Sequence, residues 1–88
     1  MKFKEGVIIT QNGEEFIIVA AGEAGEAFSG MIKLNKSAKF IAEQLKEETD
    51  VTKIVEALLS KYDVSEEVAK KSVEDLLSKF RSVGIIKE

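Results

Sequence analysis

Residues 30–41 read GMIKLNKSAKFI and join a short strand to a helix with no linker between them. The MIKL segment alternates in the manner of a strand, which places Ile32 and Leu34 on one face. Asn35 comes next and is a favourable helix N-cap, because its side-chain oxygen can accept a hydrogen bond from the first helical turn. The stretch therefore predicts a strand that ends at the start of an amphipathic helix, with Ile32 and Leu34 in the core.

An upstream segment, GVIITQNGEEFIIVA (residues 6–20), contains two β-rich apolar runs separated by Asn12-Gly13. Asn-Gly is a strong hairpin signal, because both residues tolerate the positive φ angles of a two-residue turn. The sequence thus predicts a β-hairpin with this dipeptide at its tip. The expected cross-strand pairs are Gln11 with Glu14, Ile9 with Phe16, and Val7 with Ile18. The members of the last two pairs share one face, which is expected to join the core.

The opposite face of this hairpin carries Ile8, Ile17 and Val19 and is more apolar than a fully solvated face. Two interpretations remain open: partial cover by the chain termini, or a patch on which a partner protein docks. The next ten residues, AGEAGEAFSG (21–30), show neither helical nor strand periodicity and are expected to form a loop.

Three amphipathic helices are expected after the strand at 31–34. They span about Lys36–Glu47 after the cap Asn35, about Val51–Tyr62 after the cap Asp50, and about Ser65–Val83 after Asp63 or Ser65. Gly84 is expected to end the last helix in the left-handed conformation, with Ile85 folding back onto the last turn. The order of elements predicts an α+β, winged-helix-like fold, in which a three-stranded antiparallel sheet packs on three C-terminal helices.

The 88 residues are expected to form one domain over residues 1–88, because a hydrophobic content of 44% is enough for a single core. The net charge of −3 argues against nucleic acid and against an anionic membrane surface as partners. The chain has no Cys and no His, which removes thiolate nucleophiles, the usual general base and the commonest metal ligands. No signal peptide or membrane span is recognisable, and a cytoplasmic location is expected.

Carboxylates are the remaining candidates for catalysis, and they occur as adjacent pairs such as Glu66-Glu67 and Glu74-Asp75. Neighbouring residues on one helix point about 100° apart, so they cannot face each other as acid and base. The acids also lack the spacing of a calcium loop. The chain is therefore expected not to be an enzyme, with no catalytic residue, metal ligand or cofactor-binding residue.

Two functions are compatible with this order of elements. A winged-helix arrangement suggests a DNA-binding transcription factor, but the charges of the third helix cancel, and its first turn carries Glu66 and Glu67 where a recognition helix would carry base-reading residues. The other alternative is a small structural subunit that binds a partner protein through the Ile8, Ile17 and Val19 face.

The sequence resembles the family of pyrroloquinoline quinone biosynthesis protein D and its relatives, the recognition elements of ribosomal peptide modification. The resemblance rests on Leu-Asn-x-Ser-Ala at 34–38, on IVEALLSKYDVS at 54–65 and on SVGII at 82–86, in this order. It implies no catalysis, and binding of the leader segment of a precursor peptide, which adds as a strand to the third strand and lies against the third helix. It also implies a peptide-modifying enzyme as a second partner, often a radical S-adenosylmethionine protein.

A peptide site at this strand has a physical basis, since an edge strand exposes N–H and C=O groups that an extended peptide can satisfy whatever its side chains are. One flank of the third helix, beside its core stripe, could line the groove, or it could simply be solvated. The sequence also leaves open whether the Lys33 N–H points outward. The peptide-binding candidates are Met31, Ile32, Lys33, Leu34 and Asn35 on the strand and cap, and Val68, Lys71, Ser72, Asp75 and Lys79 on the helix.

Overall fold

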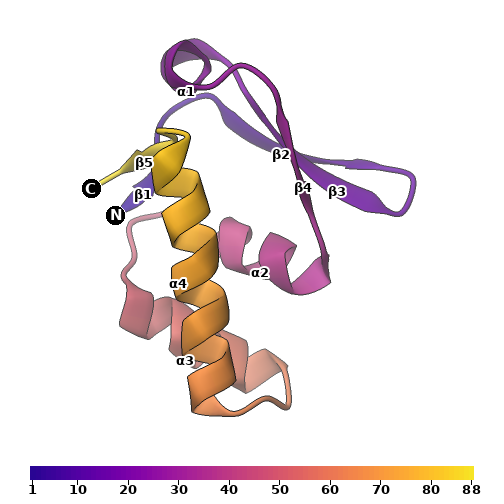
Figure 1. Cartoon of the computed structure of the whole chain (residues 1–88), viewed down its shortest axis with the longest axis vertical. Coiled ribbons are helices and arrows are strands. Elements are labelled where there is room, and N and C mark those ends of the chain that lie inside the picture. The colour runs from indigo at the N-terminus through magenta and orange to yellow at the C-terminus, as the bar shows by residue number, and fades with distance from the viewer.

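The computed structural model describes residues 1–88 and has an α+β fold with two small sheets and four helices (Figure 1). A three-stranded antiparallel sheet has the order β2-β3-β4, and a two-stranded antiparallel sheet pairs β1 with β5. The strands are β1 Lys2–Phe3, β2 Val7–Asn12, β3 Glu15–Ala20, β4 Met31–Leu34 and β5 Ile86–Lys87. The helices are α1 Gly22–Ala27, α2 Lys36–Gln44, α3 Val51–Lys61 and α4 Glu66–Ser82. The expected sheet and the three expected helices are thereby confirmed.

The hairpin has the expected strands but a different turn. Asn12 pairs with Glu15 and Ile9 pairs with Ile18, so the two loop residues are Gly13 and Glu14 and the expected pairing is wrong. Gly13 has a φ of 68°, whereas no residue other than glycine has a positive φ. Glycine alone at the first central position is typical of a type II′ turn, in which Asn12 remains in the strand. Compared with the expected pairing, each residue of β2 pairs with the β3 residue two positions later. A shift of two positions keeps the same residues on the core face.

The segment expected to be a loop contains α1. Its only buried residue is Ala24, and the N–H of Ala24 donates to the carbonyl of Glu5 at 3.0 Å. A six-residue helix with one small buried side chain has no apolar stripe, so periodicity gave no signal for it. The segment turns the chain from β3 toward β4 (Figure 1).

The helix α2 ends at Gln44, three residues earlier than expected, because β1 takes the place of the next helical turn. The Leu45 carbonyl accepts a hydrogen bond from the Phe3 N–H at 2.8 Å, and the Thr49 N–H donates to the Met1 carbonyl at 2.9 Å. In a continuing helix, the Thr49 N–H would instead donate to Leu45. The chain termini therefore pack beside the α2–α3 connection. On the hairpin's outer face, Ile17 is buried and Ile8 is exposed.

The caps and the last helix end agree with the sequence expectations. The side chains of Asn35, Asp50 and Ser65 each accept a hydrogen bond from the first turn of α2, α3 and α4. Gly84 has a φ of 78°, and the Ile85 N–H donates to the Phe80 carbonyl at 3.2 Å, which is the bond of a Schellman motif. Ile85 is fully buried, and the chain continues directly into β5.

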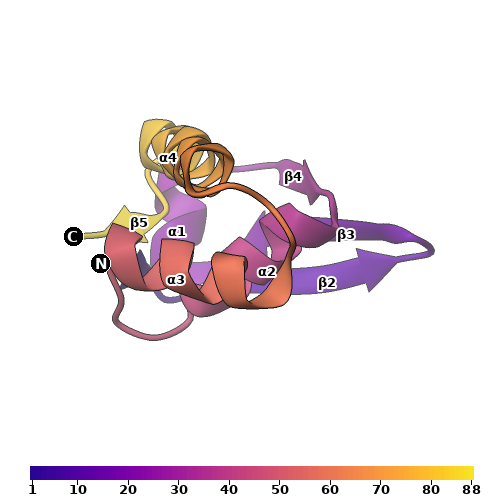
Figure 2. The same cartoon turned by 90° about the horizontal axis from the view of Figure 1, so that it is seen from below.

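One hydrophobic core of 17 buried residues joins the inner face of the three-stranded sheet to α2, α3 and α4. Figure 2 shows β4 on the same side of the molecule as α4, with α2 and β2 farther from that side. No helix is long and apolar enough to cross a membrane. The fold thus brings the edge strand of the sheet and the longest helix to one face.

Candidate functional site

The free edge of β4 is defined by the register of the sheet. Backbone groups in antiparallel strands point to the two neighbours at alternate residues. The Ala21 N–H donates to the Gly6 carbonyl at 2.9 Å, so the odd-numbered residues of β3 face β2 and the even-numbered ones face β4. Their partners in β4 are Leu34 and Ile32. The backbone groups of the other two residues, Met31 and Lys33, consequently point away from the sheet.

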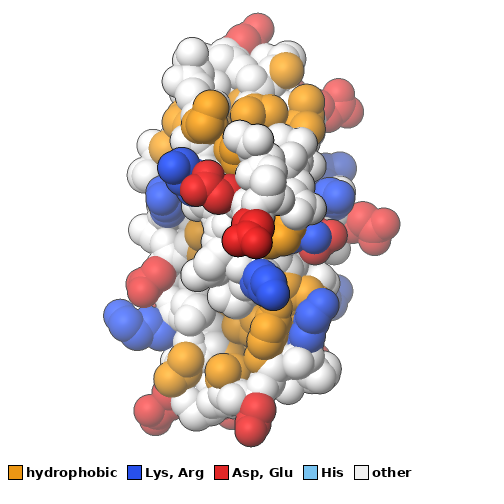
Figure 3. Space-filling view, turned by 90° about the vertical axis from the view of Figure 1, so that its right-hand side faces the viewer, with side chains coloured by type: hydrophobic (Ala, Val, Ile, Leu, Met, Phe, Trp, Pro, Cys, Tyr) orange, Lys and Arg blue, Asp and Glu red, His pale blue; other side chains and the backbone are white.

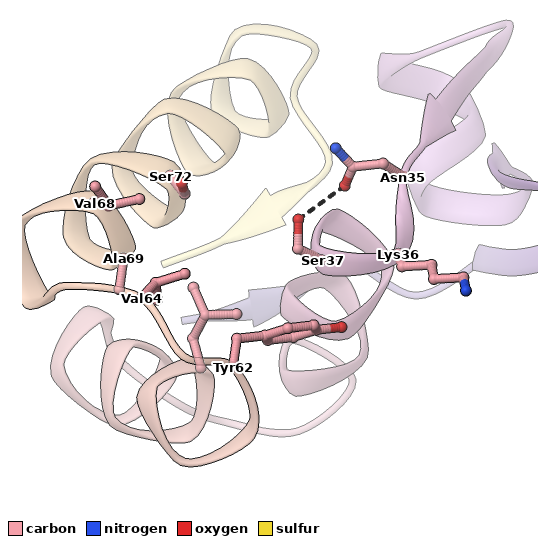
Figure 4. Close-up of a pocket in the computed structure, with 9 residues that line it drawn as sticks. Asn35, Lys36, Ser37, Tyr62, Val64, Val68, Ala69 and Ser72 are labelled. Atoms are coloured by element: carbon pink, nitrogen blue, oxygen red, sulfur yellow. Dashed lines mark hydrogen bonds between the residues drawn. The ribbon is translucent and has the colours of Figure 1, made fainter.

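A groove lies between the start of α2 and the flank of α4, directly beyond the end of β4. Its larger cavity has a volume of about 580 Å³, and a second cavity of about 310 Å³ adjoins it through three shared lining residues. The larger cavity is lined by Asn35, Lys36, Ser37, Leu58, Tyr62, Val64, Val68, Ala69 and Ser72 (Figure 4). The second is lined by Asn35, Ser37, Ala38, Ile41, Ser72, Asp75, Leu76 and Lys79.

The two cavities differ in character. The larger one has an apolar floor and side, to which α3, the α3–α4 loop and α4 each contribute. The second is smaller and includes a carboxylate and an ammonium group, those of Asp75 and Lys79. In the space-filling view from the hairpin end, hydrophobic side chains are visible near the top of the molecule and again in its lower half (Figure 3). Asn35, which follows β4 directly, lines both cavities, so an extended peptide that leaves β4 would meet both.

Asn35 stands where the strand edge meets the groove. Its Oδ1 accepts hydrogen bonds from the Ala38 N–H at 2.8 Å and from the Ser37 hydroxyl at 3.0 Å (Figure 4). Both bonds use the oxygen, so the amide nitrogen keeps two N–H donors for another group. The side chain is exposed and its cap bonds fix its orientation. Asn35 can thus offer donors to a peptide carbonyl that passes over the start of α2.

The comparison with protein families decides the family of this chain. Residues 7–86 match the model described as coenzyme PQQ synthesis protein D (PqqD). The chain belongs to the PqqD family. No curated protein matches this PqqD-family chain.

Two solved structures share the fold of this PqqD-family chain. One is TbiB1 in complex with the TbiA(beta) leader peptide, with a TM-score of 0.77 and 17% sequence identity, covering 99% of this chain and 95% of that one. The other is a lasso peptide synthetase B1 complexed with the leader peptide, with a TM-score of 0.74 and 17% identity, covering 99% of this chain and 96% of that one.

The structure brings most of the expected site residues of this PqqD-family chain together. Val68 and Ser72 line the larger cavity, Ser72, Asp75 and Lys79 line the second, and Asn35 lines both. Val68 is 54% exposed, so its apolar side chain is accessible at the wall of the larger cavity. This flank of α4 therefore faces the start of α2 and its cap.

Other expected site residues lie outside the groove. Ile32 and Leu34 have buried side chains and backbone groups directed at β3, so they support the edge from within. Met31 and Lys33 point their side chains to the outer sheet face, where Lys33 forms an ion pair of 3.7 Å with Glu15. Lys71 is exposed beside the groove and forms an ion pair of 3.6 Å with Asp75.

Sequence reasoning missed the part of the groove that α3 and the α3–α4 loop contribute. Leu58 and Tyr62 looked like ordinary packing residues of a helix, and only the folded arrangement shows that they line a cavity. Val64 left a usable signal, because it is an apolar residue between Asp63 and Ser65 in a short polar loop. It is exposed, and its side chain forms part of the cavity (Figure 4).

Proposed function

We infer that this PqqD-family domain, spanning residues 1–88, binds the leader segment of a ribosomally made precursor peptide. The leader adds as a strand to the free edge of β4 and continues through the groove between α2 and α4. One observation carries this proposal: the backbone groups of Met31 and Lys33 point away from the sheet, at an edge that runs directly into an apolar groove. Strand addition with pockets for selected side chains is a common mode of peptide recognition.

The expected affinity needs both parts of the site. The edge offers two N–H and two C=O groups, and each hydrogen bond contributes a net free energy of about 0.5–1.5 kcal/mol. These bonds therefore supply about 2–6 kcal/mol, while micromolar binding requires about 8 kcal/mol. Burying about 150 Å² of apolar leader surface in the groove adds about 4 kcal/mol, which brings the total into the micromolar range before the entropy of ordering the peptide is subtracted.

The similar structures support this proposal, because two proteins that share the fold over nearly the whole chain were solved with leader peptides bound. We expect the domain to act in the cytoplasm as a non-catalytic adaptor that presents the bound precursor to a modifying enzyme. We propose a radical S-adenosylmethionine protein as this modifying enzyme. The DNA-binding alternative gains no support, since the first turn of α4 carries two glutamates.

Amide hydrogen exchange tests strand addition directly. The probe is a synthetic leader peptide, chosen from the short open reading frames that neighbour this protein's gene. In the free protein, the Met31 and Lys33 amides should exchange rapidly, because they face solvent, whereas the Ile32 amide should be protected by β3. Saturating leader should protect the Met31 and Lys33 amides at least tenfold. Binding without this protection would contradict strand addition at β4.

A further inference from the structure

Three lysines and three aromatic rings form a shallow hollow beside the groove, which we name the lysine–aromatic patch. Its members are Phe16, Lys36, Lys39, Phe40, Lys61 and Tyr62. The hollow has a volume of about 230 Å³ and lies where β3, the start of α2 and the end of α3 meet.

Two of the three lysines of the patch, Lys39 and Lys61, lie over aromatic faces. The Lys39 ammonium lies 4.7 Å from the centre of the Phe16 ring, and the Lys61 ammonium lies 4.9 Å from the centre of the Phe40 ring. The Phe40 ring meets the Tyr62 ring edge to face, with centres 6.0 Å apart. Because these contacts restrict the side chains, the ammonium groups lose less conformational entropy when they bind an anion.

The charge of the patch opposes that of the whole chain. Only one carboxylate belongs to the hollow, that of Glu43, and it forms an ion pair of 3.6 Å with Lys39. Lys36 and Lys61 form no ion pair. The chain carries a net charge of −3, so a local excess of positive charge marks this surface as a site for a negatively charged group.

The patch is continuous with the larger groove cavity, because Lys36 and Tyr62 line both. The side chain of Lys36 extends away from the groove cavity (Figure 4). Both strand pairs of the three-stranded sheet are antiparallel, so a leader that adds in the same manner runs antiparallel to β4. The leader residues before the added strand then pass Asn35 and the larger cavity and reach the patch.

We propose that the lysine–aromatic patch binds Asp or Glu side chains of the leader, located N-terminal to the segment that pairs with β4. This inference rests on the proposed leader binding and specifies which leaders the domain accepts. The apolar cavity takes an apolar leader residue next to the strand, and the patch takes an acidic residue upstream of it. A leader with its acidic residues downstream of the strand would gain nothing from the patch.

The experiment compares two triple variants that change the net charge equally. In the patch variant, Lys36→Gln, Lys39→Gln and Lys61→Gln remove the ammonium groups but keep most of each side chain. In the control variant, Lys2→Gln, Lys46→Gln and Lys87→Gln remove three exposed ammonium groups near the chain termini. Fluorescence anisotropy measures the affinity for the same labelled leader at 50 and 300 mM NaCl, and circular dichroism verifies that each variant folds.

The patch variant should bind the leader about tenfold more weakly at low salt and should lose most of the salt dependence, whereas the control should resemble the parent. A leader in which the upstream Asp and Glu are replaced by Asn and Gln should bind the parent and the patch variant equally. Equal affinity of the patch variant and the parent for the unmodified leader would overturn the inference, while leader binding itself stands. Absence of any leader binding to the parent would instead overturn the proposed function.

Discussion

The strands β1 and β4 are both short and both lie at the edge of a sheet, but only β4 keeps one side open. On one side of β1, the Phe3 N–H donates to the Leu45 carbonyl at 2.8 Å; on the other, the Lys4 N–H donates to the Ile85 carbonyl at 2.9 Å. In β4, the backbone groups of Met31 and Lys33 face no strand. The chain therefore closes both sides of β1, with the α2–α3 connection on one side and with β5 and the residue before it on the other, and leaves one side of β4 free.

The difference shows that the rest of the chain can close both sides of a short edge strand, so the short length of β4 does not by itself explain its open side. The Phe3 side chain is buried and meets the Phe80 ring edge to face at 5.3 Å, so β1 is also anchored by the core. An unpaired edge is an aggregation hazard, which proteins limit by short length and by lysine. β4 has four residues and carries Lys33, so it follows both rules and still remains available to a peptide.

The largest effect is expected when a proline breaks the closed edge. Lys4→Pro removes the N–H that bonds Ile85 and leaves the Ile85 carbonyl without this donor. We expect the free energy of unfolding to fall by about 2 kcal/mol, measured by urea denaturation. The leader affinity of the folded fraction should not change, because β1 lies away from the groove. Lys4→Ala keeps the N–H and serves as the control.

A proline at the open edge should lower the leader affinity and leave the free energy of unfolding nearly unchanged. Lys33→Pro removes a donor that no strand uses, so the free energy of unfolding should change little. Leader affinity should fall at least tenfold, or about 1.4 kcal/mol, measured by fluorescence anisotropy. The control, Lys33→Ala, removes the same side chain and its ion pair with Glu15 but keeps the N–H.

The two proline variants test whether the edge at β1 is closed and the edge at β4 is open. If Lys33→Pro unfolds the protein while Lys33→Ala does not, the Lys33 N–H points toward β3 and the assignment of the free edge is reversed. A folded Lys33→Pro protein with the parent's affinity would mean that the leader does not pair with β4.

Most of the helical part of the fold could be predicted from the sequence, because caps and apolar spacing are local signals. Asn35, Asp50 and Gly84 each act as expected, since their roles depend on residues within one turn. The hairpin register could not be predicted as reliably, because Asn12-Gly13 suits two turns that differ by one position. The early end of α2 depends on β1, which lies more than forty residues away along the chain, and no local signal reveals it.

The candidate site was only partly predictable for the same reason. The flank of α4 follows from helical spacing once the core stripe is known, which is why Val68 and Ser72 could be proposed as a pair. The direction of the Lys33 N–H follows only from the register of two strand pairs. The contribution of Leu58 and Tyr62 depends on how α3 packs against α4, and packing at that distance leaves no local pattern in the sequence.

The smallest expected effects concern the groove wall, where a side chain and not the strand edge is changed. Val68→Ala removes two methyl groups from the larger cavity and should weaken leader binding about threefold, or about 0.7 kcal/mol. The free energy of unfolding should not fall, because Val68 is largely exposed and alanine favours a helix more than valine does. Ser72→Ala should weaken binding less than threefold, whereas Ser78→Ala, the same change on α4 outside the groove, should leave the affinity unchanged. Isothermal titration with the leader measures all three variants. If Ser78→Ala weakened binding as much as Val68→Ala, the peptide would lie on another face of α4, and the open edge of β4 would lose its groove.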